Sequence, residues 1–214
     1  KLGFSVSQTM IVAQRLYESG LITYMRTDSV NLSDLALSTS RKTIADMMGE
    51  KYVKTRQFAT KSKGAQEAHE AIRPTYISNE QIEASAQEQK LYELIWKRTI
   101  ASQMADAELE KTTATITISN SNETFIAVGE VVTFDGFLRV YRESYDDDNE
   151  QETESRLLPP LAVGQNLKYT EVLATQRFTM CPPRYTEASL VRKLEELGIG
   201  RPSTYAPTIS TIQQ

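Results

Sequence analysis

Hydrophobic residues in the first 110 positions recur at helical spacing. The pattern predicts helices over 5–20, 33–49 and 78–104, each beginning at a serine suited to an N-cap, and the first two ending at a glycine. Ser5 with Gln8 three residues later has the form of a capping box. The apolar residues that define the three helical faces are Met10, Ala13, Leu16 and Tyr17; Leu37, Ile44 and Met48; and Ile82, Leu91, Leu94, Ile95 and Met104.

Near residue 111 the period changes from helical to alternating. Strands are predicted over 112–119 ("TTATITIS") and 124–134 ("TFIAVGEVVTF"), because apolar and polar residues alternate there around the turn-forming "NSNE". Asp135-Gly136 is a hairpin signal before "FLRVY" at 137–141. The segment 166–178, "NLKYTEVLATQRF", is predicted to close this strand-rich region.

From Pro182 the helical pattern returns. Thr186 is the predicted N-cap and Gly198 the predicted end of a helix, and a last helix is predicted to be capped by Ser203. The face of the first of these helices carries Leu190, Leu194 and Leu197. The order of elements indicates an α+β multidomain fold divided into 1–110, 111–181 and 182–214.

The charge distribution and the single cysteine and histidine limit the kinds of function that the chain can have. The net charge of −4 is dominated by 143–154, "ESYDDDNEQETE", which holds seven acids; the rest of the chain has 21 acidic and 24 basic residues. This run is predicted to be a solvated loop, so a polyanion partner is compatible with the composition. The single cysteine, Cys181, and the single histidine, His69, exclude a disulfide framework, a cysteine-built zinc site and a multi-histidine metal site within these 214 residues.

Location follows from the same features. No apolar run is long enough to cross a bilayer, and the low cysteine content favours a reducing, cytoplasmic compartment. The sequence begins without methionine and stops inside a predicted helix, so a piece of a longer protein is expected.

The stretch "LITYMRTDS" at 21–29 carries the main candidate chemistry. In an extended conformation Tyr24 and Arg26 are expected to share one face, with Ile22 and Met25 turned toward a core. A guanidinium beside the phenol can bind a phosphate and lower the cost of ionising the phenol, which would make Tyr24 a nucleophile. The ordinary alternative is that Tyr24, one of ten tyrosines, packs its ring and satisfies its hydroxyl.

Two further stretches are open to two interpretations each. His69 in "EAHEAIRP" is either a site residue or a hydrogen-bonded structural histidine between carboxylates. Arg201 in "GIGRPST" precedes a helix entry that could bind a phosphate, or it belongs to a simple turn with an N-cap.

Three blocks resemble the bacterial type IA DNA topoisomerases. They are "KLGFSVSQTMIVAQRLYESGLITYMRTDSVNLS", "AQEAHEAIRPT" and "PRYTEASLVRKLEELGIGRPSTYAPTISTIQ", in the family's order and at both ends of the chain. The related topoisomerase III pattern usually has proline after the tyrosine, where this sequence has Met25.

The resemblance implies an enzyme that relaxes negatively supercoiled DNA without ATP. Tyr24 would attack a single strand to form a 5′-phosphotyrosine link and a free 3′-hydroxyl, and Arg26 would contact the scissile phosphate. His69 would help position the complex. Arg201, Ser203 and Thr204 would contact single-stranded DNA.

It also implies parts that lie outside this chain. In the family, Mg²⁺ ligands come from an N-terminal Toprim domain, and zinc ribbons follow at the C-terminus. We therefore expect no metal ligand here, an inactive chain without Toprim, and DNA and the rest of the polypeptide as partners of a cytoplasmic monomer. By resemblance, 1–110 would be a tyrosine-bearing domain that swings open, 111–181 part of a β-rich arch, and 182–214 the start of a strand-guiding domain. The acidic run would face away from DNA.

Two other functions are weighed against strand passage. A non-catalytic DNA-binding module would have no need for Tyr24 beside Arg26. A tyrosine recombinase would carry several scattered arginines around its tyrosine and form a 3′-phosphotyrosine link, and the order of motifs here does not fit it.

Overall fold

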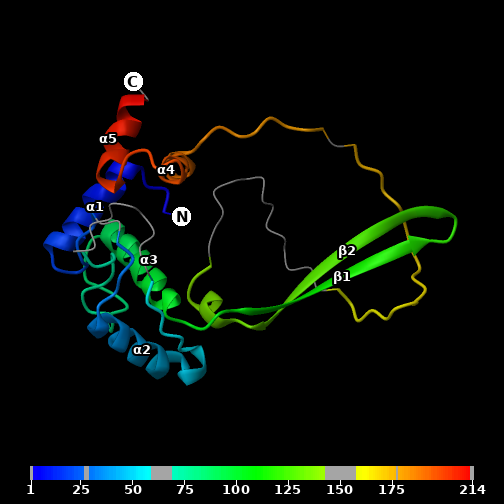
Figure 1. Ribbon diagram of the computed structural model, residues 1–214, viewed down its shortest axis with the longest axis horizontal. Coiled ribbons are helices and arrows are strands. Elements are labelled where there is room, and N and C mark those ends of the chain that lie inside the picture. The colour runs from blue at the N-terminus through cyan, green and yellow to red at the C-terminus, as the bar shows by residue number, and fades with distance from the viewer. Residues whose placement is uncertain (1, 27–28, 59–68, 143–157, 177, 213–214) are drawn as a thin grey trace. The chain divides into compact units, whose positions relative to one another are not determined.

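The computed structural model describes residues 2–26, 29–58, 69–142, 158–176 and 178–212 (Figure 1). The chain divides into two compact units. The helical unit comprises Lys1–Ala107, Asp135–Asp146 and Tyr185–Gln214, and the ribbon unit comprises Glu108–Phe134 and Asp147–Arg184. Helices in one unit and a two-stranded sheet in the other give the mixture of helix and sheet that the sequence predicts. The predicted boundaries near 110 and 181 stay predictions, and the acidic run lies outside the described residues.

Three helices form the core of the helical unit. They are α1 (Val6–Glu18), α2 (Asp34–Met48) and α3 (Ala86–Ser102), and α3 contacts both of the others (Figure 1). Buried side chains from all three meet here, and each contributes about 1.5–3 kcal/mol relative to an exposed position. The largest are Trp96, Tyr92, Leu16, Ile44 and Ile100. The Trp96 indole N–H donates to the Ile77 carbonyl at 2.8 Å, which satisfies its one polar atom.

The predicted starts of the first two helices are confirmed, and that of the third is wrong. Ser5 and Ser33 each accept a hydrogen bond from the backbone three residues on. Helix α3, however, begins at Ala86, with Ser85 rather than Ser78 as its N-cap, because Ser85 and Glu88 form a reciprocal capping box that satisfies two backbone donors. Met104 lies beyond its end, in an isolated bridge with Val53.

The ribbon unit contains one antiparallel hairpin, shown in Figure 1. Strands β1 (Glu108–Ile118) and β2 (Ser121–Phe134) pair with Ala114 opposite Ala127 and with register shifts near both ends. The two predicted strands are confirmed, and both are longer than the alternation indicated. The predicted strand at 166–178 is wrong for its described residues, which form neither helix nor strand. Alternation alone does not supply the backbone partners that a strand needs.

The predicted strand after Asp135-Gly136 is also wrong. Residues Gly136–Arg139 form a short 3₁₀ helix, η2, within the helical unit. Gly136 has φ +47°, and a Cβ there would lie 2.4 Å from the Asp106 carbonyl oxygen. The glycine therefore permits a close backbone approach rather than a hairpin turn, and the next N–H, of Phe137, donates to the Ala105 carbonyl.

Two helices lie at the C-terminal end of the described chain. Helix α4 (Glu187–Glu196) is capped by Thr186 in a capping box with Ser189 and is followed by Gly198 at φ +68°, as predicted. Helix α5 (Pro202–Ile212) begins at its proline, so the prediction of Ser203 as N-cap is wrong. Proline is favoured at the first helical position because its missing N–H is not needed there. Helix α5 contacts α1, and the Glu187 carboxylate accepts the Val6 N–H at 2.8 Å. Among the described helices, none has the length and apolarity to cross a bilayer.

Candidate active site

The segment that carries Tyr24 is held by backbone hydrogen bonds to the segment around Arg73. The Thr23 N–H donates to the Arg73 carbonyl at 2.9 Å, and the Thr75 N–H donates to the Leu21 carbonyl at 3.0 Å. The Thr23 hydroxyl adds two bonds, because it donates to the Ala71 carbonyl and accepts the Arg73 N–H. Tyr24 is thereby tied on its N-terminal side to a part of the chain nearly fifty residues away.

The extended conformation considered for the Tyr24 stretch is not regular. The pairing is a single isolated bridge between Ile22 and Pro74, and the backbone bends at residues 23, 25 and 26. Ile22 and Met25 are both buried, as predicted, with exposed fractions of 2% and 6%. In a regular strand residues three apart face opposite sides, so this burial requires the bend. The alternation of side chains along a strand therefore does not determine where the Tyr24 and Arg26 side chains point.

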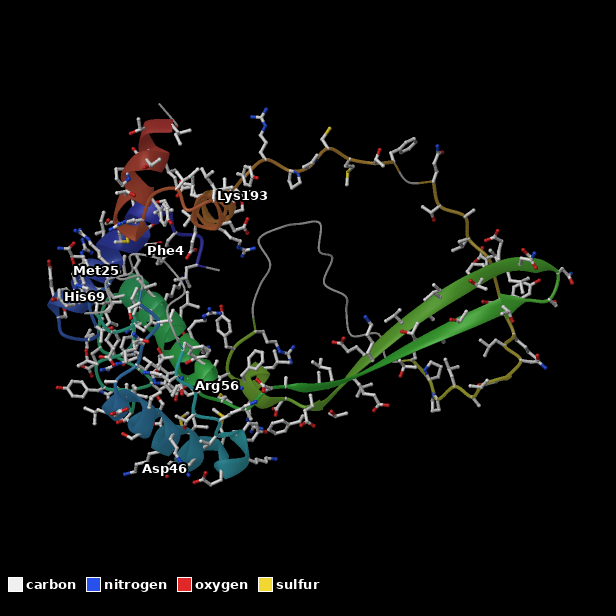
Figure 2. All side chains as sticks on the ribbon, viewed as in Figure 1. Phe4, Met25, Asp46, Arg56, His69 and Lys193 are labelled. Atoms are coloured by element: carbon white, nitrogen blue, oxygen red, sulfur yellow. The ribbon has the colours of Figure 1, made fainter. Side chains whose placement is uncertain are left out.

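Aromatic rings flank Tyr24. The Tyr17 ring lies 5.2 Å away, centroid to centroid, with an interplanar angle of 68°, and the His69 ring lies 5.4 Å away with an angle of 41°. Figure 2 marks His69 and Met25, the residue after Tyr24, in this region. The structure thus brings together Tyr24 and His69, two residues that the resemblance singled out. The Tyr24 side chain is partly buried.

Tyr17, whose ring contacts Tyr24, was not singled out from the sequence. The sequence placed it on the apolar face of the first helix, but its side chain is 42% exposed. Its position in the last turn before a glycine, seven residues ahead of Tyr24, is the signal that could have found it.

Arg26 is exposed and is oriented by α1. Its guanidinium donates to the Gln14 side-chain oxygen at 3.3 Å, and the Gln14 amide nitrogen donates in turn to the Glu18 carboxylate at 2.8 Å. The Glu18 bond fixes which way the Gln14 amide faces, since only the amide nitrogen can donate. Sequence reasoning also missed this pair, although the i,i+4 spacing of Gln14 and Glu18 on a helix is a recognisable signal.

A partly buried ion pair orders the segment of His69. The Glu70 carboxylate accepts two hydrogen bonds from the Arg73 guanidinium, both 2.8 Å, and one from the Ser33 N–H. Burial raises the pKa of Glu70, but the bonds from Arg73 and Ser33 outweigh it, so that pKa lies below its usual value. This two-bond geometry is the strong form of a carboxylate–guanidinium contact.

Arg201, Ser203 and Thr204 lie together at the start of α5. The Thr204 hydroxyl accepts the Arg201 N–H at 2.9 Å and donates to the Arg201 carbonyl, which closes the first turn. Gly200 has φ +76°, and a Cβ there would press on the Thr204 and Tyr205 side chains at 3.2 Å. All three predicted residues are exposed in the helical unit. Within the described part of the chain, no hydrogen bond or ion pair joins them to Tyr24.

The described residues do not form a metal site. No group of three or more His, Cys, Asp and Glu side chains in the described ranges has a geometry that could hold an ion. The described residues therefore offer no site in which three or more such side chains could hold a magnesium ion.

A comparison of the full sequence with protein families shows which family the chain belongs to. A family model described as DNA topoisomerase matches residues 1–214. The chain belongs to the DNA topoisomerase family. The resemblance to bacterial DNA topoisomerases is thereby confirmed along the whole chain.

Individual topoisomerases agree with this assignment. The chain is 51% identical to DNA topoisomerase 1 of Zymomonas mobilis and 52% identical to that of Rickettsia bellii, with all of this chain covered in both cases. It spans 18% and 28% of the lengths of these two relatives. The fold is similar to that of full-length topoisomerase I from Thermotoga maritima, with a TM-score of 0.82, 39% identity, and coverage of 99% of this chain and 35% of the other.

Proposed function

We propose that this chain is the tyrosine-bearing part of a type IA DNA topoisomerase and that Tyr24 is its nucleophile. The observation that carries the proposal is the setting of Tyr24, whose partly buried ring lies against Tyr17 and His69 on a segment tied to Arg73. A tyrosine that only filled a core would be fully buried, whereas this one is ordered and still accessible. The family assignment supports the same conclusion.

The reaction would exchange one phosphodiester for another. The Tyr24 oxygen attacks phosphorus and forms an O–P bond, while the bond from phosphorus to the 3′ oxygen breaks. The phenol proton is lost and the departing 3′ oxygen gains a proton, which leaves a 5′-phosphotyrosine and a free 3′-hydroxyl. Since the phosphodiester energy is kept in the protein–DNA link, the reverse step reseals the strand without ATP. Passage of another strand through the break would relax negatively supercoiled DNA.

Arg26 would contact the scissile phosphate. Its present partner, Gln14, is neutral and lies at 3.3 Å, so the guanidinium keeps its full charge and can turn to an anion at small cost. A guanidinium–phosphate contact is charge-assisted, and it stabilises the charge that develops on the phosphate oxygens.

Arg201, Ser203 and Thr204 would bind the backbone of the single strand. They lie at the N-terminal end of α5, where the helix dipole favours a phosphate and the residues are exposed. His69 would help position the complex from its place beside Tyr24.

Magnesium would be supplied from outside this chain. As the family resemblance implies, its ligands would come from a Toprim portion, where the ion would neutralise phosphate charge. The chain alone is then inactive. The complete enzyme would act on DNA in the cytoplasm as a monomer.

The test uses single-stranded DNA labelled at its 3′ end, because the piece that becomes linked carries the 5′ phosphate. The DNA is incubated with Mg²⁺ and this chain, with and without a separately expressed Toprim portion, and label that stays with the denatured protein is measured. We expect an adduct only when both parts are present, and none with Tyr24→Phe.

The matched control is Tyr76→Phe, which removes a hydroxyl from a tyrosine that is 66% exposed. This variant should form the adduct as the unaltered chain does. An adduct that persists in Tyr24→Phe would disprove the nucleophile, and strand binding without any adduct would favour a non-catalytic module.

A further inference from the structure

We propose that Tyr17 is a positioning residue for Tyr24, which it orients through an edge-to-face ring contact. The two centroids are 5.2 Å apart and the rings are inclined at 68°, the geometry in which the positive edge of one ring meets the negative face of the other. The orienting contact is independent of the reaction; its catalytic consequence rests on the proposed function of Tyr24.

Tyr17 stands on a rigid base. It lies in the last turn of α1, which ends in a Schellman motif: the Gly20 N–H donates to the Tyr17 carbonyl at 2.8 Å, and the Leu21 N–H donates to the Leu16 carbonyl at 2.9 Å. Leu16 itself is 1% exposed and anchors this turn in the core. The position of the Tyr17 backbone is therefore fixed on both sides by hydrogen bonding and packing.

The segment of Tyr24 needs such support. Its backbone bends on both sides of Tyr24 and is not part of a strand ladder. A tyrosine side chain has three staggered χ1 positions, and a partly exposed one can populate more than one of them. A ring pair of this kind favours one position over the others by about two- to tenfold. His69 contacts the same ring, and together the two neighbours select a single orientation.

The ring of Tyr17 carries this role. The contact with Tyr24 is between rings, so a phenylalanine would preserve it, whereas a leucine would remove the aromatic edge. With 42% of its side chain exposed, Tyr17 contributes less to the core than a buried aromatic residue, and the leucine variant is expected to fold. Ile11, which is 56% exposed on the same helix, provides a control for the loss of exposed apolar surface from α1.

The first test needs no DNA. Tyr24 is replaced by 3-fluorotyrosine in the full chain, and its ¹⁹F resonance is compared among the unaltered chain, Tyr17→Phe, Tyr17→Leu and Ile11→Ala. Loss of the Tyr17 ring current changes the chemical shift by itself, so the line width is the readout. We expect the Tyr17→Leu resonance to narrow as the Tyr24 ring becomes free to change χ1, while the other two variants keep the original line width. An unchanged line width in Tyr17→Leu would overturn the proposal.

The second test measures the consequence for cleavage. With the Toprim portion present and DNA saturating, Tyr17→Leu should slow adduct formation by about two- to tenfold, and Tyr17→Phe should restore the rate. The affinity for single-stranded DNA should stay the same. A weaker affinity at an unchanged rate would make Tyr17 a DNA contact and overturn the positioning role.

The two tests also separate this inference from the proposed function. If the unaltered chain forms no adduct with any Toprim portion, the proposed reaction fails, and the ¹⁹F comparison still decides whether Tyr17 orients Tyr24.

Discussion

At the scale of single residues, Arg26 is held by a neutral side chain, that of Gln14, where a carboxylate could have stood. The neutral Gln14 amide orients the guanidinium and leaves its charge uncompensated, whereas a carboxylate at the same place would pair with that charge and cancel it. The Glu18 carboxylate accepts a hydrogen bond from the Gln14 amide nitrogen instead, and this bond fixes which way the amide faces. Arg26 is thus ordered yet still free to bind an anion.

Gln14→Glu should therefore lower the rate of adduct formation by about tenfold, and Gln14→Ala by only about two- to threefold. The carboxylate both competes for Arg26 and repels the DNA phosphate, so the loss in Gln14→Glu should shrink as salt concentration rises. The rate is measured with the labelled strand and the Toprim portion over a salt series.

The matched control for this prediction is the double variant Gln14→Glu with Glu18→Gln, which moves the carboxylate from position 18 to position 14 at constant net charge. It should be as slow as Gln14→Glu. A rate equal to that of the unaltered chain in either variant would show that Arg26 does not depend on a neutral partner.

At the scale of elements, η2 is seated against the chain that follows α3. Gly136 makes this possible because it has no Cβ. A Cβ at this position would overlap the carbonyl oxygens of Asp106 and Ala105. The Tyr52 hydroxyl donates to the Asp135 carboxylate at 2.8 Å, and this bond, with the charge of Arg139, lowers the pKa of Asp135. Residues distant in sequence thus determine the conformation of a segment that local pattern predicted to be a strand.

Gly136→Ala should reduce the free energy of unfolding by about 2–4 kcal/mol, from the left-handed backbone and the overlap together. The measurement is urea denaturation followed by the fluorescence of Trp96, the single and buried tryptophan. Gly198→Ala is the control, since Gly198 has φ +68° with open space around it, so only the left-handed backbone costs free energy there, about 1–2 kcal/mol. Equal losses in the two variants would contradict the close approach at Gly136.

At the scale of the whole molecule, the Glu70–Arg73 pair links three separate parts of the chain. It joins the His69 segment, the start of α2 through Ser33, and, through the Arg73 backbone, the segment of Tyr24. Because the pKa of Glu70 is lower in the folded state, its contribution to stability is complete above its ordinary value of 4.5 and is lost as pH falls through the folded value.

Glu70→Gln should consequently destabilise the protein at pH 7 and show a weaker loss of stability on acidification. The free energy of unfolding of the variant and the unaltered chain should differ most at pH 7 and converge as pH falls well below 4.5. Urea denaturation at pH 7 and in the acidic range measures the difference. A difference that stays constant with pH would show that the Glu70 charge does not contribute.

The sequence predicted the features that depend on neighbouring residues and not those that depend on contacts between distant residues. Helix starts at Ser5, Ser33 and Thr186 were predicted because a cap involves only neighbouring residues. The bend at Tyr24 and the 3₁₀ helix at Gly136 were not, because partners far along the chain determine them. For the candidate site, family motifs pointed to Tyr24 and His69, whose rings the structure brings together, but not to Tyr17 or Gln14, whose contacts with Tyr24 and Arg26 depend on distances that no motif states.

The reversal of the chain at Gly20 has a consequence for how the site assembles during folding. It brings the Arg26 guanidinium to Gln14 across only 12 residues, whereas the Thr23 hydroxyl reaches Ala71 across 48. Closing a short loop loses less chain entropy and happens earlier than closing a long one. The contacts between α1 and the segment of Tyr24 should therefore form almost as soon as the helix does. The contacts between that segment and the segment of His69 should form later.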